Sequence, residues 1–197
     1  MKPEEIELLR ELTIVMPTCE KPENLERAIE YWRDTPITVH IVDGSKNPWF
    51  RVGVLPDIST ITYHHLPSTA NEVPLENYSR RLQFSITLPT TKYSALCADD
   101  DVFTISGLCA LIRILENDLN CDAIVGQTLG FYPQNKLVRW WLRYGVVSSD
   151  NLSSRNQDAI VRLGRSPLML YYAIVRTDLW IKRIQITQKH VSLGMRW

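Results

Sequence analysis

Apolar residues along this chain alternate between short continuous runs and helically spaced stripes. The runs at 12–16 and 38–42 are each followed by turn-forming residues, which is typical of strands covered on both faces. Between them, Pro22 can open a helix whose apolar residues follow helical spacing: Leu25, Ala28, Ile29 and Trp32. Strand, helix and strand within about thirty residues form a βαβ unit, so these strands are expected to be parallel.

The same alternation continues further along the chain. Strands are predicted at 61–65, 93–98 and 122–129, and a helix at 75–88 with one apolar side made of Leu75, Tyr78, Leu82 and Ile86. The clearest helix includes 108–119, where leucine and isoleucine recur at amphipathic spacing. We therefore predict an α/β protein with three layers, α/β/α, around a mostly parallel central sheet. Beyond residue 131 the pattern loosens.

Composition narrows the class of protein without naming a partner. Of the 197 residues, 45% are apolar, and the 22 Lys and Arg balance the 22 Asp and Glu, so no net field attracts nucleic acid. The four cysteines form no CxxC pair and are interpreted as reduced packing thiols. No apolar run approaches a membrane span, and the first residues are too acidic for a signal peptide, so a cytoplasmic location is expected, with peripheral membrane association left open.

An acidic cluster follows the predicted strand at 93–98. In YSALCADDDVF, Asp99, Asp100 and Asp101 are adjacent, and like charges repel unless a proton or a divalent cation offsets them. The alternative is a solvated first turn of the next helix, where acids are favourable. Ligands of parallel sheets bind beyond the carboxyl ends of the strands, and the first two predicted strands deliver Thr18 and Asp43 to that edge.

Three motifs in this order resemble those of the GT-A glycosyltransferases, especially family 2 and its relatives. They are IVMPTCEKPENLERAIEYW with its Pro-Thr pair, VHIVDGS with its Asp-Gly-Ser turn, and YSALCADDD with a DxD metal motif. The resemblance covers about residues 12 to 130. It implies the GT-A fold, with 1–130 as the nucleotide-sugar-binding half and 131–197 as a partial acceptor-side region of the same domain.

The resemblance also implies an activity and a set of site residues. The activity is metal-dependent transfer of a sugar from a nucleoside diphosphate sugar, commonly a uridine diphosphate sugar, to an acceptor hydroxyl on a glycan, lipid-linked or protein acceptor. Asp43 would accept a hydrogen bond from the base, although it could instead cap its own turn. Arg81 would approach the nucleotide, with Arg80 competing and a solvated helix face as the alternative. The remaining implied contacts are Pro17 and Thr18 with the nucleotide, Asp99 and Asp100 with the donor, and Asp99 and Asp101 with Mn²⁺ or Mg²⁺.

The sequence departs from the family pattern in its catalytic base. Inverting enzymes of this kind need a carboxylate that deprotonates the acceptor, yet the chain has no aspartate or glutamate beyond Asp178. Asp178 is a weak candidate, Asp150 and Asp158 are weaker, and His190 is a candidate extra metal ligand. A chain truncated at its C-terminus would explain the missing acid. The alternative function is a degenerate or truncated domain that binds a nucleotide sugar without turnover.

Overall fold

The computed structural model describes residues 1–49, 58–69, 71–134, 137–142, 172–182 and 184, with the backbone alone for 131–142. The chain divides into two compact units, which are described separately: Met1–Ile124 together with the stretch from Ile174 onward, and Val125–Ala173. The predicted division into functional halves at residue 130 stays a prediction.

A six-stranded sheet forms the centre of the first unit, in the order β3-β2-β1-β4-β8-β5. The first four strands in this order are parallel, while β8 is antiparallel to both β4 and β5. The α/β class with a mostly parallel sheet is therefore confirmed. The strands are β1 (Leu12–Thr18), β2 (Thr38–Asp43), β3 (Ile61–His65), β4 (Tyr93–Leu96), β5 (Ala123–Ile124) and β8 (Ile174–Arg176).

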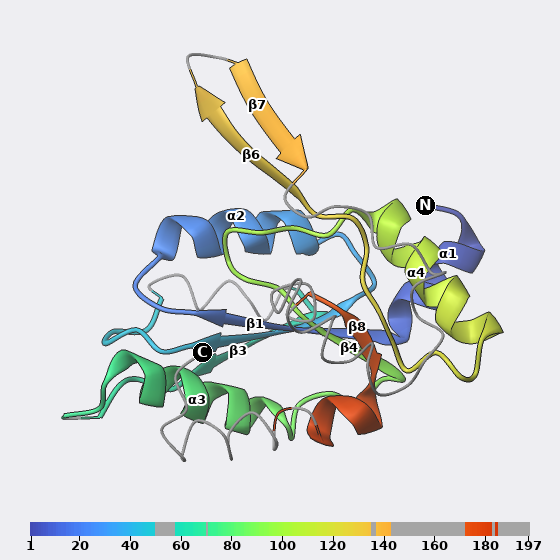
Figure 1. Ribbon diagram of the computed structural model, residues 1–197. Helices are drawn as coiled ribbons and strands as arrows, with labels where there is room; N and C mark the ends of the chain where they lie inside the picture. Colours follow the sequence, from blue (N-terminus) through green and yellow to red (C-terminus); the bar gives the residue numbers. More distant parts are fainter. Residues whose placement is uncertain (50–57, 70, 135–136, 143–171, 183, 185–197) are drawn as a thin grey trace, which may run out of the picture. The chain divides into compact units, whose positions relative to one another are not determined.

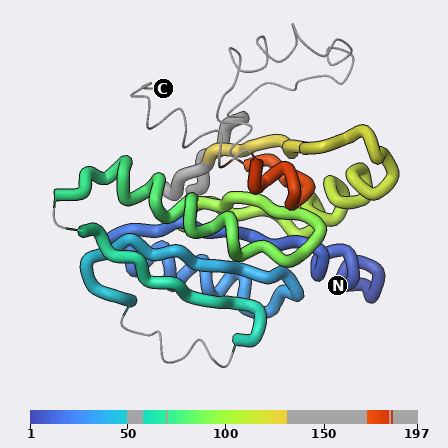
Figure 2. The backbone as a smooth tube through the Cα atoms, turned by 90° about the horizontal axis from the view of Figure 1, so that it is seen from below, coloured from blue at the N-terminus to red at the C-terminus, as the bar shows by residue number. Residues whose placement is uncertain are grey.

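Helices cover both faces of this sheet, which gives the three layers (Figure 1). In that view α2 and α4 lie above the strands, and α3 lies below them with the helical stretch 177–182. Figure 2 views the sheet from the α3 side. The helices are α1 (Pro3–Arg10), α2 (Pro22–Trp32), α3 (Pro74–Ser85) and α4 (Ile105–Asn117).

The core forms where the sheet meets these helices. All seven residues of β1 are buried, as expected for a central strand covered on both faces. The apolar stripe predicted for α2 is confirmed, because Leu25, Ala28, Ile29 and Trp32 are all buried. All four cysteines are free thiols; Cys97 and Cys109 are buried in the core, as expected for packing residues, whereas Cys19 and Cys121 are only partly buried.

The helix α3 differs from its predicted apolar stripe. Leu75 is 56% exposed, and the buried residues are Leu82 together with the polar Asn77, Arg81 and Ser85. The three polar residues recur every four positions, so they share one face of the helix. The expectation was wrong because this face approaches strand ends, where backbone carbonyls need hydrogen-bond donors.

Several other elements also differ from expectation. The N-terminal helix α1 was not predicted, and the strand expected at 122–129 is confined to Ala123–Ile124. Beyond it, in the second unit, β6 (Leu129–Gln134) and β7 (Leu137–Leu142) form an antiparallel hairpin. Strand β4 ends at Leu96 and not at residue 98, because a hydrogen bond from Asp101 N to Ala98 O closes a turn there.

Candidate functional site

Strand register brings three chain segments together at the carboxyl edge of the sheet. Thr18 ends β1 directly opposite Asp43, which ends β2. On the other side of β1, Cys97 N donates to Val15 O, so the chain after β4 emerges beside the end of β1. The Thr18 hydroxyl then donates to Asp99 Oδ2 at 2.6 Å. The three motifs found in the sequence therefore meet at one place.

Asp43 is buried and already well bonded. Its Oδ1 accepts from the backbone N–H of Ser45 at 2.8 Å and from the Ser45 hydroxyl, and its Oδ2 accepts from the Tyr63 hydroxyl at 2.6 Å. Asp43 thus caps its own turn, as one of the two sequence readings predicted. A carboxylate offers about four acceptor positions, so these three bonds leave one for a further donor.

Tyr63, on β3, is a site residue that sequence reasoning missed. Its hydroxyl donates to Asp43 and accepts from the backbone N–H of Trp49 at 2.9 Å. Burial and the hydrogen bond to Asp43 raise the pKa of Tyr63, which keeps the hydroxyl protonated as a donor. Nothing in the strand sequence ITYHH distinguishes such a tyrosine from a packing residue.

Arg81 lies beneath the ends of β1 and β2. Its Nη1 donates to Thr18 O at 2.6 Å and to Val42 O at 3.3 Å, and its Nε donates to Asn77 Oδ1 at 2.9 Å. The guanidinium is buried, which excludes the solvated helix face considered from the sequence. In this structure Arg81 holds the backbone of two strand ends, and its predicted approach to a nucleotide stays a prediction.

Gly44 is required by this approach of α3. A Cβ added at Gly44 would lie 2.3 Å from Asn77 Oδ1 and 2.6 Å from Arg81 Nε. Both side chains are buried and held by hydrogen bonds, so neither can give way easily. The glycine of the Asp-Gly-Ser turn therefore serves close packing of the turn against α3.

Arg80 points to a different partner. It forms an ion pair with Glu72, at 2.9 Å between Nε and Oε1, and donates to Pro67 O at 2.7 Å. The hydrogen bond from Arg80 lowers the pKa of Glu72 to about 2. Arg80 thus ties the loop before α3 to the helix, and Arg81 is the arginine that enters the strand ends.

The three acids lie in a turn, Ala98–Asp101, which we call the acid turn. Asp99 is buried, whereas the Asp100 side chain is 53% exposed. Lys21 Nζ lies 3.4 Å from Asp99 Oδ1 and 3.5 Å from Asp100 Oδ2. Burial alone would lower the pKa of the Lys21 ammonium, but the two carboxylates outweigh it and raise that pKa. The sequence motif contains no sign of this lysine's position.

A cavity of about 210 Å³ lies at the same edge. Its polar lining includes Thr18, Lys21 and Asp43, and its apolar lining includes Leu25 and Trp49. This volume is below the roughly 300–1,000 Å³ of pockets that enclose a whole small ligand. The cavity therefore suits one flat ring of a larger ligand, whose remainder would extend outside it.

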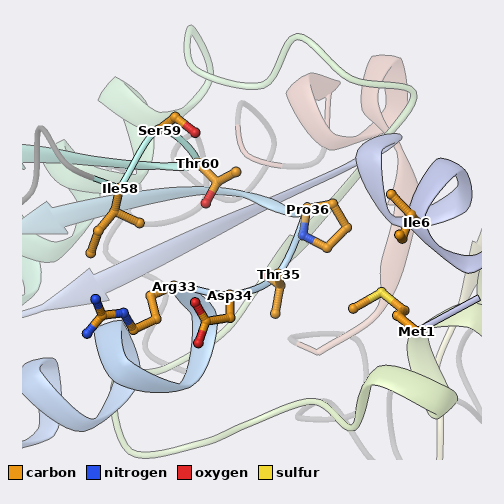
Figure 3. Close-up of a pocket in the computed structure, with 9 residues that line it drawn as sticks. All are labelled: Met1, Ile6, Arg33, Asp34, Thr35, Pro36, Ile58, Ser59 and Thr60. Carbon is orange, nitrogen blue, oxygen red and sulfur yellow. The ribbon is translucent and has the colours of Figure 1, made fainter. Parts of the chain in front are cut away.

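A larger cavity, of about 590 Å³, lies at the opposite edge, before β2 and β3 (Figure 3). Arg33 and Asp34 line it at the end of α2, together with residues such as Ile58 and Thr60. None of the motifs that predicted a site contributes to this cavity. Because ligands of parallel sheets bind beyond the carboxyl ends of the strands, we assign the candidate site to the smaller cavity and the acid turn.

Two further predicted residues have clear positions. Pro17 is buried within β1, where it pairs with Val42. Asp178 is exposed and follows β8, where Thr177 N donates to Lys92 O at the start of β4. Asp178 therefore lies at the opposite end of β4 from the acid turn, and the structure does not bring it to the site. The positions of Asp150, Asp158 and His190 lie outside the described residues.

The donors of the acid turn fit a hard divalent cation. Asp99 and Asp101 are carboxylates, the donor type that such cations prefer, and a positive charge, the Lys21 ammonium, lies 3.4 Å from Asp99 and 3.5 Å from Asp100. Within the described residues, no three His, Cys, Asp or Glu side chains gather as a metal cluster. Mg²⁺ commonly takes one or two carboxylates, with waters and substrate phosphates as its other ligands. Two carboxylates are therefore compatible with a metal that binds together with a phosphate ligand.

Comparison with solved structures found chains with a similar fold. The similar structures include the crystal structure of S. aureus TarS 1-349, a glycosyltransferase, with a TM-score of 0.52 and 14% sequence identity. The match covers 87% of this chain and 48% of the TarS chain. At this identity the likeness concerns the fold, and it does not single out family 2.

Other comparisons found no relative. No protein-family model matches the chain, and no curated protein matches it. No helix among the described residues has both the length and the apolar character that crossing a membrane requires. The predicted cytoplasmic location and peripheral membrane association stay predictions.

Proposed function

We propose that this protein is a glycosyltransferase that binds a nucleoside diphosphate sugar, with uridine diphosphate as the carrier, at the carboxyl edge of β1, β2 and β4. The observation that carries the proposal is the 2.6 Å hydrogen bond from Thr18 to Asp99. Thr18 also lines the smaller cavity, so this bond joins the cavity to the acid turn. A ligand with a flat ring at one end and phosphates at the other matches that arrangement.

The cavity supports the choice of a single-ring base. Its apolar lining, which includes Leu25 and Trp49, can contact the faces of a flat ring. The remaining acceptor position of Asp43 can take a ring N–H, which uracil offers. Because Tyr63 and Ser45 hold the carboxylate, Asp43 is oriented before the ligand arrives.

The acid turn supports the choice of a diphosphate with a cation. Mn²⁺ or Mg²⁺ would be held by Asp99 and Asp101, with phosphate oxygens completing its ligands. When bound, the cation would stabilise the negative charge that gathers on the departing diphosphate. The chain's own contribution is to keep Asp99 in place through the Thr18 hydroxyl and to provide the nearby Lys21. Transfer also requires a base for the acceptor hydroxyl, and Asp178 at the far end of β4 is poorly placed for that role.

Binding is tested by calorimetry with uridine diphosphate in the presence and absence of MnCl₂. We expect binding that depends on Mn²⁺ and is lost in Asp101→Ala. Asp34→Ala is the matched control, because Asp34 lines the larger cavity at the opposite edge. Binding without Mn²⁺, or binding lost in Asp34→Ala and kept in Asp101→Ala, would contradict the site.

The second candidate function is nucleotide-sugar binding without turnover, and the position of Asp178 favours it. Slow hydrolysis of uridine diphosphate sugars in the absence of an acceptor distinguishes the two. Release of free sugar that disappears in Asp101→Ala supports the transferase. Tight binding with no release over a panel of donor sugars supports the binding protein.

A further inference from the structure

Backbone hydrogen bonds hold Lys21 in place between the cavity and the acid turn. It is the residue before α2, and its carbonyl accepts the first helical hydrogen bond, from Leu25 N at 3.1 Å. The preceding Glu20 has a left-handed backbone, with φ 55°, and its N–H donates to the Ser45 hydroxyl at 2.7 Å. A non-glycine residue with positive φ persists only where its surroundings hold it. The loop that presents Lys21 is therefore a built feature of the site.

The side chain of Lys21 is held much less firmly than its backbone. It is 50% exposed, and its distances of 3.4 and 3.5 Å to Asp99 and Asp100 exceed the roughly 2.7–2.9 Å of strong charged hydrogen bonds. Lysine also has a long flexible stem and a compact charge that can exchange partners. The ammonium of Lys21 thus offsets the negative charge of Asp99 and Asp100 without forming short hydrogen bonds to them.

We propose that Lys21 is a tethered counter-ion of the acid turn: it holds Asp99 and Asp100 while the site is empty, and it transfers to the phosphates of the donor when a divalent cation takes its place. Lys21 lines the cavity, and its ammonium lies beside the acids, so this residue borders both parts of the proposed site. The transfer of the ammonium to the donor phosphates rests on the proposed function. The role of Lys21 as counter-ion in the empty site concerns only the protein and the cation.

The consequence is a coupling between metal and donor. Without donor, a cation must displace an ammonium that is already paired with Asp99, one of the two carboxylates proposed to hold the cation, so the affinity for the cation is reduced. With donor present, the displaced ammonium finds phosphate oxygens, so the two ligands favour each other's binding. Lys21 would then prevent the site from holding a metal ion that is not accompanied by substrate.

The competing explanation is that Lys21 only supports the start of α2. Lys21→Met separates the two, because methionine keeps the backbone and most of the stem but removes the charge. Lys21→Arg keeps the charge. Lys92→Met is the control for loss of a surface ion pair elsewhere, since Lys92 pairs with Glu116 at 2.7 Å and is 45% exposed.

The experiment measures Mn²⁺ binding to the nucleotide-free chain by electron paramagnetic resonance, followed by uridine diphosphate titration at saturating Mn²⁺. We expect Lys21→Met to bind Mn²⁺ about three- to tenfold more tightly than the unmodified chain, the range of one or two partly exposed ion pairs. It should also bind uridine diphosphate more weakly, while Lys21→Arg and Lys92→Met stay close to the unmodified chain in the first measurement.

If Lys21→Met binds Mn²⁺ as tightly as the unmodified chain or more weakly, the counter-ion role of Lys21 is wrong. The same conclusion follows if neither chain binds Mn²⁺. Unchanged uridine diphosphate affinity in that variant would overturn the transfer to phosphate. If the unmodified chain binds no uridine diphosphate, the proposed function fails, and the nucleotide-free Mn²⁺ comparison still decides the counter-ion. Thermal melting of each variant confirms that it is folded.

Discussion

The ends of β2 and β4 lie at the same edge of the sheet but are held in opposite ways. At the end of β2, Asp43 is buried and accepts hydrogen bonds from Ser45 and Tyr63. Arg81 donates a hydrogen bond to the carbonyl of Thr18, at the end of the neighbouring strand. At the end of β4, backbone hydrogen bonding closes the acid turn, and the partners of the Asp99 carboxylate include the Thr18 hydroxyl at 2.6 Å and the half-exposed Lys21 at 3.4 Å. The first end is rigid, and the second can exchange its partners.

The difference indicates a division of labour within the proposed site. A group that recognises a flat ring must keep its orientation, and internal hydrogen bonds supply that orientation in advance. A group that accepts a cation and a phosphate must give up its resting partner, which an exposed ion pair allows at small cost. The perturbations below should therefore affect the end of β2 mainly in stability and the end of β4 mainly in binding.

Arg81→Met should have the largest effect on stability. It removes a buried cation and leaves Thr18 O, Val42 O and Asn77 Oδ1 without this donor, so we expect a loss of about 3 kcal/mol in the free energy of unfolding. Urea denaturation measures the loss. Arg80→Met is the matched control, expected to cost only about 1 kcal/mol because the Arg80 side chain is 36% exposed and Glu72 keeps its hydrogen bond from Thr69 N. Equal losses in the two variants would contradict the rigid end of β2.

Gly44→Ala should destabilise the same end by overpacking. The new methyl group would overlap Asn77 and Arg81, and we expect a loss of about 2 kcal/mol by urea denaturation. Gly107→Ala is the control, since its methyl group would meet only the Thr104 side chain at the start of α4. That Cβ would lie 2.6 Å from the hydroxyl of Thr104, an exposed N-cap side chain that can rotate away, so we expect a cost of only about 1 kcal/mol or less for the lost cap. A Gly44→Ala chain as stable as the control would show that the turn is not tightly packed.

Lowering the pH should reduce the free energy of unfolding through a histidine pair on β2 and β3. His40 Nδ1 and His64 Nε2 lie 3.1 Å apart on β2 and β3; burial and the nearby His64 lower the pKa of His40 to about 4, and burial lowers that of His64. The unfolded chain therefore takes up protons first, so stability is full above about pH 6.5 and declines as the pH falls towards 4. Allowing for solvent screening, we expect a loss on the order of 1–2 kcal/mol across that window.

The pH effect is measured by thermal melting at a series of pH values. His64→Phe keeps a ring beside Phe84 and removes one titrating group, so its stability should fall less steeply with pH. The same slope in both chains would show that the histidine pair is not the cause.

Lys21→Met should have the smallest effect on stability, below about 0.5 kcal/mol, because the Lys21 side chain is 50% exposed and the buried Asp99 keeps its hydrogen bond from Thr18. Its effect should be confined to the binding of Mn²⁺ and uridine diphosphate described above. If Lys21→Met loses as much stability as Arg81→Met, the proposed difference between the ends of β2 and β4 is wrong. Urea denaturation of both variants measures the two losses.

Much of the fold could be predicted from local patterns. The strands β1 and β2 follow continuous apolar runs, and the stripes of α2 and of α4 up to Leu115 follow a period of 3.6 residues; both signals are visible in the sequence, although Leu119, expected on the α4 stripe, lies beyond the helix and is exposed. The misses have a common cause. The stripe of α3 is polar because distant strand ends need donors, and β8 joins the sheet from a segment far along the chain. The polar face of α3 and the pairing of β8 depend on contacts between distant segments, which the local pattern of apolar residues does not reveal.

The candidate site divides in the same manner. The sequence by itself determined the residue types delivered to the strand ends: Thr18 at the end of β1, Asp43 at the end of β2 and the acids after β4, because each directly follows an apolar run. Only the tertiary structure decided their partners, since a hydrogen bond or an ion pair requires two groups within a few ångströms. It placed Tyr63 on Asp43, buried Arg81 beneath the strand ends and set Lys21 against Asp99, at separations of 20, 63 and 78 residues for the bonds involved.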